Sequence, residues 1–331
     1  IQDREALLVS TPEKLKAEFN IDVRTRHEVV AVRAGDHEID VRDLTSGSTY
    51  TLSYDKLLLS PGAKPFVPPV PGIDLEGVFT LRTIPDMDRI KQHIDEVGAR
   101  EAVVVGGGFI GLEMVEALRK RGLQVSVVER LPHVMPIMEG EIAGFLQEEL
   151  LSYGVGVYTS RSVEEINSSH VLLDDGTRLR ADMVLMSVGV RPTLKLATEA
   201  GLELGDAGGL LVDQYLRTSD PSIFAAGDMV EIEHKINGAK VRIPLAGPAN
   251  RQGRIAADVI MGRPARFRGV QGTSVVGILD LVVAFVGSSE KTLTRLGLWN
   301  SEYEKIYLHP GHHAGYYPGA SPISLKLIFR K

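Results

Sequence analysis

The stretch VVVGGGFIGLE, residues 103–113, decides the fold class of this chain. Its valines predict a buried strand, and Gly106, Gly108 and Gly111 fit the spacing G-x-G-x-x-G. A helical pattern follows over residues 112–121, and a second apolar strand over residues 125–129 ends on a carboxylate. Strand, glycine turn, helix, strand and terminal acid are together the context that a dinucleotide-binding βαβ unit requires. The sequence therefore predicts an α/β, Rossmann-like domain around this turn.

Each position of the turn has a physical role in binding a dinucleotide. Gly106 permits the tight turn, Gly108 lets the backbone approach the pyrophosphate, and Gly111 lets the helix pack on the strand. Ile110 lies between them, where the start of the helix offers N–H groups and partial positive charge to phosphates. Glu129 is expected to accept hydrogen bonds from the adenosine ribose hydroxyls, which favours NADH over NADPH. The plainer alternative is a glycine-rich turn that holds no ligand.

Four neighbours are further candidates for this site, and each has a plainer alternative. Phe109 could cover the nicotinamide or pack in the core. Glu113 could hold the nicotinamide amide or simply stabilise the first helical turn. Arg130 could stack on adenine, meet a 2′-phosphate or be a solvated cation, so use of NADPH stays open. Gly189 could form a second backbone wall for the dinucleotide or only end a strand.

Composition restricts the class of protein. With 331 residues, 44% of them hydrophobic, 24% charged and a net charge of −6, the chain predicts two or three globular domains and no general nucleic-acid binder. The best apolar run, residues 275–286, contains Asp280, so no membrane-spanning helix is expected. The chain has no cysteine, which excludes disulfides, Cys metal sites and thiol catalysis within it. No secretory signal pattern is visible, and we expect a cytoplasmic protein.

Two further strand ends carry polar turns that could belong to a second nucleotide site. LLLSPGA, residues 57–63, and TSDPSIFAAGD, residues 218–228, are both apolar strands that end at a glycine. A carboxylate at a strand end can accept hydrogen bonds from a polyol or ribose. On local sequence alone, however, Asp228 could equally be a helix N-cap or a turn aspartate.

Four segments follow one another in the order LLLSPGAKP, VVVGGGFIGLE, SVGVRPT and TSDPSIFAAGD. Through these segments the chain resembles the FAD- and NAD(P)-dependent pyridine nucleotide–disulfide oxidoreductases over nearly its whole length. PLAGPANRQGR (244–254), GILDLVVAFVG (277–287) and HHAGYYPGASP (312–322) are similar to coenzyme A-disulfide reductase and its NADH oxidase, peroxidase and polysulfide reductase relatives. The resemblance implies an α/β fold of two Rossmann-like, three-layer nucleotide-binding domains and an α+β dimerisation domain. The implied divisions are 1–97 (FAD-binding domain, first part), 98–216 (NAD(P)-binding domain), 217–265 (FAD-binding domain, second part) and 266–331 (dimerisation domain).

The resemblance also assigns roles to single residues. It implies that FAD is lined by Ser60, Pro61, Gly62, Gly227 and Asp228, with Val29 near the adenine. Arg24 and Asn250 would contact coenzyme A, and Tyr316 would reach across a homodimer toward the thiol. Plainer alternatives are a strand-face cation for Arg24 and a packing or interface role for Tyr316.

Two departures from the family pattern leave the substrate open. Asn250 stands where some members have histidine, and Phe109 stands where a tyrosine gate is frequent. His312 and His313 are adjacent, so their side chains diverge on a strand, and no metal site is expected there.

In the family a hydride passes from NAD(P)H through the flavin to a cysteine, which reduces a disulfide, peroxide, oxygen or polysulfide. The family's first βαβ unit and its redox cysteine do not occur in this sequence, and we expect it to be part of a longer chain at both ends. The leading prediction is a coenzyme A-disulfide reductase that acts as a homodimer on a small disulfide or sulfur substrate. The alternatives are an NADH oxidase or peroxidase, a polysulfide or persulfide reductase, and a non-catalytic NAD(H)-binding module.

Overall fold

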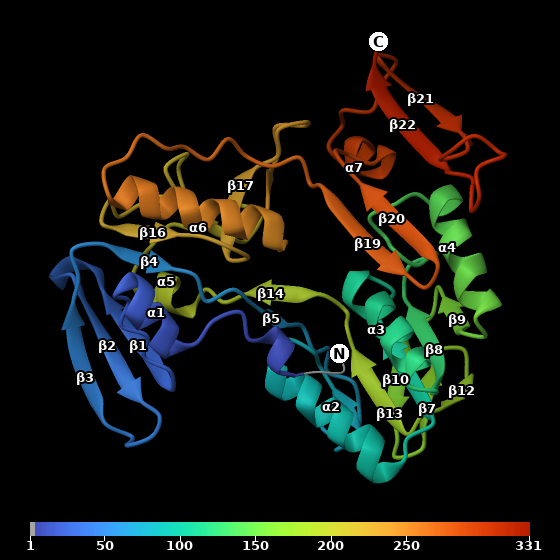
Figure 1. Cartoon of the computed structure of the whole chain (residues 1–331), viewed down its shortest axis with the longest axis horizontal. Coiled ribbons are helices and arrows are strands. Elements are labelled where there is room, and N and C mark those ends of the chain that lie inside the picture. Colours follow the sequence, from blue (N-terminus) through green and yellow to red (C-terminus); the bar gives the residue numbers. More distant parts are fainter. Residues whose placement is uncertain (1–3) are drawn as a thin grey trace. The chain divides into compact units, whose positions relative to one another are not determined.

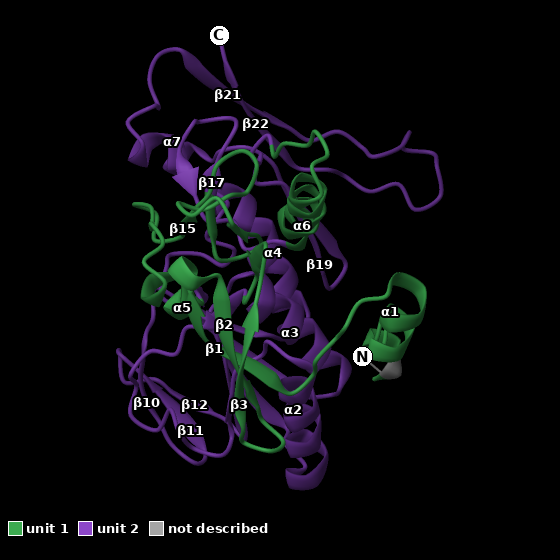
Figure 2. Ribbon diagram, turned by 90° about the vertical axis from the view of Figure 1, so that its left-hand side faces the viewer, with its two compact units in different colours: residues 1–61, 193–231, 246–267 green, residues 62–192, 232–245, 268–331 purple. Residues whose placement is uncertain are grey.

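The computed structural model describes residues 4–331 and divides the chain into two compact units (Figure 2). Unit 1 comprises the chain up to Pro61, Thr193–Glu231 and Ala246–Phe267; unit 2 comprises Gly62–Pro192, Ile232–Leu245 and Arg268–Lys331. The backbone therefore passes between the units several times. The four-part domain division expected from the sequence stays a prediction.

Unit 2 is built on a five-stranded parallel sheet with the strand order β6-β13-β7-β8-β9. These strands are β6 (Val78–Phe79), β13 (Met183–Met186), β7 (Glu101–Val105), β8 (Gln124–Glu129) and β9 (Gly156–Thr159). A parallel sheet is normally covered on both faces, so its strands are apolar throughout. The valines of β7, Val103 and Val104, are accordingly both fully buried.

The two faces of this sheet pack against different layers. Val104 belongs to a core cluster with Ile90, Leu112 and Leu146, from helices α2 (Ile84–Val97), α3 (Phe109–Lys120) and α4 (Gly140–Ser152). Val103 belongs to a second cluster with residues of the antiparallel sheet β10 (Val163–Ile166), β11 (His170–Leu173) and β12 (Arg178–Arg180). Unit 2 thus has helices on one face of the parallel sheet and a small antiparallel sheet on the other (Figure 1).

Local sequence explains where the helices of unit 2 begin. At α2, Thr83 and Asp86 form a reciprocal capping box and Pro85 occupies the first turn. Helix α3 begins at Phe109, three residues before the start predicted from the sequence, because Gly108 is its extended N-cap residue. Glu113 consequently lies beyond the first turn of α3, so it cannot act as the first-turn carboxylate of the plainer alternative.

The remaining elements of unit 2 are short strands, two hairpins and one short helix. They are β5 (Ala63–Pro65), β14 (Val190–Pro192), β18 (Lys240–Val241), β19 (Ser274–Ile278), β20 (Leu281–Phe285), α7 (Glu290–Arg295), β21 (Tyr303–Leu308) and β22 (Leu325–Arg330). In the β21–β22 hairpin, Tyr307 pairs with Lys326, and Ile306 pairs with Leu327. Tyr307 and Lys326 both bind Glu141 of α4, and Ile306 and Leu327 are exposed, as is Tyr307.

Unit 1 combines an antiparallel sheet, short parallel pairs and helices. Its elements are η1 (Glu5–Leu7), α1 (Pro12–Phe19), β1 (His27–Arg33), η2 (Ala34–Asp36), β2 (Glu38–Asp43), β3 (Thr49–Ser53), β4 (Leu57–Leu59), α5 (Lys195–Glu199), β15 (Leu210–Leu211), β16 (Ile223–Ala225) and α6 (Ala246–Ile260). Strand β17 (Val230–Glu233) crosses the boundary between the units. Strand β1 begins at His27, directly after Arg26, which takes a left-handed backbone conformation in a turn. Within residues 4–331, every helix is too short or too polar to span a bilayer.

Candidate dinucleotide site

Two glycines of the turn between β7 and α3 are required by the protein itself. Gly106 has φ +108°, and a Cβ atom there would lie 2.4 Å from the carbonyl oxygen of Ser187. A Cβ atom on Gly111 would lie 2.0 Å from the carbonyl oxygen of Gly106. Both contacts are with backbone atoms and cannot be relieved by a side-chain rotation. Gly106 and Gly111 therefore close the turn and seat α3 on β7, as the sequence predicts.

Gly108 differs from these two, because nothing in the described chain excludes a side chain there. Its φ of −86° and ψ of −170° are accessible to any residue, and no atom of residues 4–331 beyond its chain neighbours lies within 4 Å of its Cβ position. The residue is the N-cap of α3, where the first N–H groups of a helix have no acceptor within the helix. Two residues further along the chain, Ile110 is exposed. The turn thus leaves open space where an anion can meet the positive end of the α3 dipole.

Glu129 ends β8 and is oriented by the backbone of the turn. Its side chain is only 8% exposed. Oε2 accepts the N–H of Gly107 at 2.8 Å, and Oε1 accepts the N–H of Leu131 at 2.8 Å. Because a carboxylate has about four acceptor positions, two remain for ribose hydroxyls. The ribose contact itself stays a prediction, while the hydrogen bond to Gly107 is a role that the spacing did not indicate.

The loop that follows Glu129, residues 130–139, is named here the β8–α4 loop. The N–H of Met135 donates to the carbonyl oxygen of Gly107 at 2.7 Å. Val134 is fully buried, and its Cγ1 lies 3.0 Å from the Cβ position of Gly107. Both polar backbone groups of Gly107 are therefore bound, one by Glu129 and the other by this loop.

The other candidates around this turn lie at its edges. Phe109 is the first residue of α3, is half-buried and packs against the helical core cluster. Glu113 and Arg130 are both exposed. Gly189 has φ +107°, and two residues earlier the hydroxyl of Ser187 donates to the carbonyl oxygen of Val105 at 2.9 Å. The chain leading to Gly189 is thereby tied to the strand that enters the turn.

A second group of candidates comes together in unit 1. Strands β4 and β16 pair in parallel, and the N–H of Ala226 donates to the carbonyl oxygen of Leu59 at 3.0 Å. Ser60 and Pro61 therefore leave the sheet beside Gly227 and Asp228, which belong to a turn that precedes β17. No helix begins at Asp228, so the helix N-cap alternative is wrong and a turn position remains.

Gln252 of α6 supports this second group. It is 1% exposed, and its Oε1 accepts the N–H of Gly227 at 2.7 Å. Gly227 has φ +84° and Gly62 has φ +72°, the left-handed region that glycine occupies readily. Val29 lies apart from these turns in sequence, half-buried on β1 of the β1-β2-β3 sheet.

The candidates for coenzyme A lie in exposed positions. Arg24 is in the segment before β1, where its guanidinium donates to Asp22 and to the Tyr50 hydroxyl, each at 3.0 Å. These hydrogen bonds, that of Tyr50 first, raise the pKa of Arg24. Asn250 is exposed on α6, and Tyr316 is 92% exposed in the segment between β21 and β22.

The paired histidines lie in that same segment. The rings of His313 and Tyr317 stack with centroids 4.6 Å apart. In the part of the chain that the structure describes, no group of three or more His, Cys, Asp or Glu side chains could hold a metal ion.

Sequence reasoning missed Gln252 and the β8–α4 loop. Gln252 lies within the PANRQGR segment and carried no local signal, because a helical glutamine is usually a solvated residue. The loop carried none either, since its contacts to Gly107 are made by backbone atoms.

Comparisons with known proteins agree with this geometry. A family model for pyridine nucleotide-disulphide oxidoreductases matches residues 2–253. The NADH oxidase of Methanocaldococcus jannaschii is 36% identical over 340 residues, covering 100% of this chain and 74% of the relative. The coenzyme A disulfide reductase of Staphylococcus haemolyticus is 32% identical over 330 residues, covering 99% and 73%. Reduced CoADR-RHD of Bacillus anthracis superposes with a TM-score of 0.96 at 44% identity, covering 100% of this chain and 59% of that one. The chain therefore spans about three quarters of the two curated relatives and less than two thirds of this solved structure.

Proposed function

Because the chain belongs to the pyridine nucleotide-disulphide oxidoreductase family, we propose that it belongs to a flavoprotein that takes hydride from NAD(P)H and reduces coenzyme A disulfide or a related sulfur substrate. Bound FAD would supply the electron transfer between the nicotinamide and the substrate. The residues of this chain would bind, orient and shield the two nucleotides. The redox cysteine that the family uses is not among the 331 residues.

The open position at Gly108 is the observation that carries this proposal. Contacts within the protein explain Gly106 and Gly111, whereas no contact among the described residues requires glycine at position 108, which supports a ligand that approaches the backbone closely there. In the proposed complex the pyrophosphate meets the N-terminus of α3 at Gly108, Phe109 and Ile110, with Gly189 as a second wall. Glu129 binds the adenosine ribose, Arg130 lies near the adenine, and Phe109 and Glu113 lie on the nicotinamide side.

The residues of unit 1 fit the second nucleotide. Ser60, Pro61, Gly227 and Asp228 leave two paired parallel strands at the same edge, where ligands bind in α/β sheets. We propose that they line FAD together with Gly62, and that Val29 lies near the adenine. The proposal includes the four-part division 1–97, 98–216, 217–265 and 266–331.

Coenzyme A is proposed as the sulfur-carrying substrate, with contacts from Arg24 and Asn250. The names of the Staphylococcus haemolyticus reductase and of the Bacillus anthracis structure support this choice. Tyr316 is proposed to reach the thiol across a homodimer, a role that suits its 92% exposure. A reductase for oxygen is the second candidate, since the Methanocaldococcus jannaschii relative at 36% identity is called NADH oxidase.

The test is made on the full-length protein. Flavin absorption in the purified protein and bleaching by NADH are expected, followed by faster turnover with coenzyme A disulfide than with oxygen, peroxide or polysulfide. Tyr316→Phe should slow disulfide reduction more than flavin reduction, and equal slowing would leave Tyr316 a structural role. Protein that purifies without flavin and does not bind it would contradict the proposed function. Oxygen as the preferred acceptor would favour the NADH oxidase.

A further inference from the structure

The β8–α4 loop is held in a conformation that it does not favour by itself. Met135, whose N–H binds Gly107, has φ +49°. A non-glycine residue in this left-handed region costs about 1–3 kcal/mol and persists only where its surroundings enforce it. Several contacts from outside the loop hold it: Val134 and Met135 are buried in the helical core cluster, and the N–H of Val134 donates to Oε1 of Gln147 at 3.3 Å.

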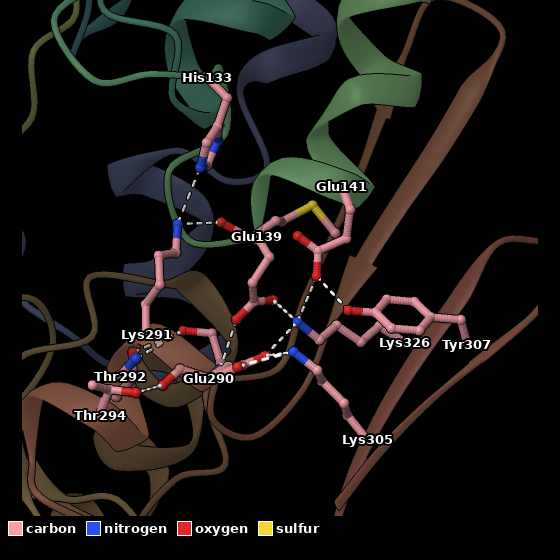
Figure 3. A network of polar contacts seen from close by, with 12 residues as sticks. His133, Glu139, Glu141, Glu290, Lys291, Thr292, Thr294, Lys305, Tyr307 and Lys326 are labelled. Carbon is pink, nitrogen blue, oxygen red and sulfur yellow. Dashed lines mark hydrogen bonds and ion pairs between the residues drawn. The ribbon is translucent and has the colours of Figure 1, made fainter. Parts of the chain in front are cut away.

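Lys291 of α7 adds a polar restraint at both ends of this segment (Figure 3). Its ammonium donates to the carbonyl oxygen of Pro136 at 3.0 Å, to the carbonyl oxygen of Met138, and to Nε2 of His133 at 3.2 Å. An ammonium has three N–H donors, and all three bind acceptors of one loop. The lysine thus fixes both ends of the segment that contains Met135.

His133 is placed to accept one of these hydrogen bonds. Its Nδ1 lies 2.8 Å from the carbonyl oxygen of Val134, which can only accept. Nδ1 must therefore carry the proton, and Nε2 presents its lone pair to Lys291, which can only donate. The imidazole so links Lys291 to Val134, the residue whose side chain packs on Gly107.

The loop in turn holds α7. Oε1 of Glu139 accepts the N–H of Glu290 at 2.6 Å, at the first turn of α7. Lys326 of β22, 5% exposed at its side chain, lies 3.0 Å from the Glu290 carboxylate and 3.6 Å from that of Glu139. Helix α7 is therefore fixed relative to the loop through Glu139, Lys291 and Lys326, as Figure 3 shows.

We propose that Lys291 is a positioning residue of the dinucleotide site. From α7 it fixes the β8–α4 loop, and through Met135 and Val134 the loop fixes the backbone of Gly107 beside the pyrophosphate position. Lys291 touches neither nucleotide nor substrate. The inference rests on the proposed function, because it assumes that this turn binds NAD(P)H.

The test compares Lys291→Met with Lys305→Met in the full-length holoenzyme. Lys305 belongs to the same network, but its ammonium binds the Glu290 carboxylate instead of the loop. Each hydrogen bond contributes about two- to tenfold in an equilibrium, so Lys291→Met should raise the Kd and the KM for NADH about threefold to tenfold. The kcat with ferricyanide as acceptor and the FAD content should stay at the wild-type values. Hydrogen exchange of a peptide that contains Met135 should become faster.

Lys305→Met should leave the KM for NADH and the exchange of that peptide unchanged. His133→Ala removes one of the three acceptors of Lys291 and should also raise the KM for NADH, but by less than Lys291→Met. If Lys291→Met does not fold, His133→Ala is the variant that tests the inference. A wild-type KM in the folded variants, or an equal rise in Lys305→Met, would overturn the inference. Wild-type protein that binds no NADH would overturn the proposed function as well, which separates the two failures.

Discussion

The carboxylate of Glu129 accepts the backbone N–H of Gly107 at 2.8 Å, so the acid that ends β8 is bound to the glycine turn that begins α3. This contact adds a side-chain link between the two halves of the βαβ unit, whose strands β7 and β8 also pair in the sheet. It also sets the direction of the carboxylate before any nucleotide binds. A substitution at Glu129 must therefore affect the fold and the choice of nucleotide together.

Glu129→Gln tests both effects. The amide keeps one acceptor oxygen, so either Gly107 or Leu131 loses its partner, at a cost of about 1–3 kcal/mol in the free energy of unfolding. We expect a higher KM for NADH and a smaller preference for NADH over NADPH. Glu231→Gln is the control, because Glu231 is also buried but lies in unit 1. A strong preference of the wild type for NADPH would contradict the ribose role of Glu129.

Gly108→Ala and Gly111→Ala should have opposite consequences. The new methyl group at position 108 meets open space, so the protein should fold normally and bind NADH at least about tenfold more weakly, which corresponds to about 1.4 kcal/mol. At position 111 the methyl group would meet the carbonyl oxygen of Gly106 at 2.0 Å, so the melting temperature should fall sharply. Thermal unfolding and NADH titration of both variants measure this. Unchanged NADH affinity in Gly108→Ala would show that no ligand approaches there.

Gln252→Leu should release FAD. The substitution leaves the N–H of Gly227 without its acceptor in a half-buried turn, which costs about 1 kcal/mol and frees the turn that carries Asp228. The expected result is a lower ratio of flavin absorption to protein absorption after dialysis. Gln92→Leu is the control, since Gln92 is exposed on α2 and binds only Glu96 among the described residues. Full flavin content in Gln252→Leu would remove Gln252 from the site.

The ion pair between Glu141 and Lys326 should make stability depend on pH. Burial raises the pKa of Glu141, but hydrogen bonds from Lys326 and Tyr307 outweigh it and lower the pKa from 4.5 to about 2. Burial alone would lower the pKa of Lys326. Its hydrogen bonds to Glu141 and Glu290 outweigh the effect of burial and raise the pKa of Lys326. The contribution of Glu141 is therefore complete above pH 4.5 and is lost as the pH falls toward 2. The contribution of Lys326 is complete below pH 10.5 and is lost only at higher pH.

Denaturant unfolding at about pH 7 and at about pH 3 measures the acid limb. Glu141→Gln should be less stable than the wild type at the higher pH, and the difference should shrink at the lower pH. Glu148→Gln, an exposed neighbour on α4, should change neither value. An equal destabilisation by Glu141→Gln at both pH values would contradict the pKa shift.

The parallel βαβ unit could be predicted from the sequence because its signals are local. Valines, glycines and a terminal acid follow one another within 30 residues, and each restricts the backbone on its own. The start of α3 was predicted too late, because Phe109, Ile110 and Gly111 have weak helix propensity, and the open N-cap of Gly108 decides the helix start.

The support around the site could not be predicted, because it consists of contacts between distant segments. Lys291 and the β8–α4 loop are more than 150 residues apart, and their hydrogen bonds use carbonyl groups that every residue has. Gln252 and Gly227 likewise meet only after α6 has packed. The expected site residues carry chemistry that can be read from side chains, whereas these restraints depend on tertiary packing.

The unequal freedom of the three glycines has an evolutionary consequence. Descendants that no longer bind a nucleotide lose the selection for glycine at position 108, whereas their folding still requires glycine at positions 106 and 111. A homologue with alanine or serine at position 108 and glycine at positions 106 and 111 is therefore expected to fold normally but to lack oxidoreductase activity.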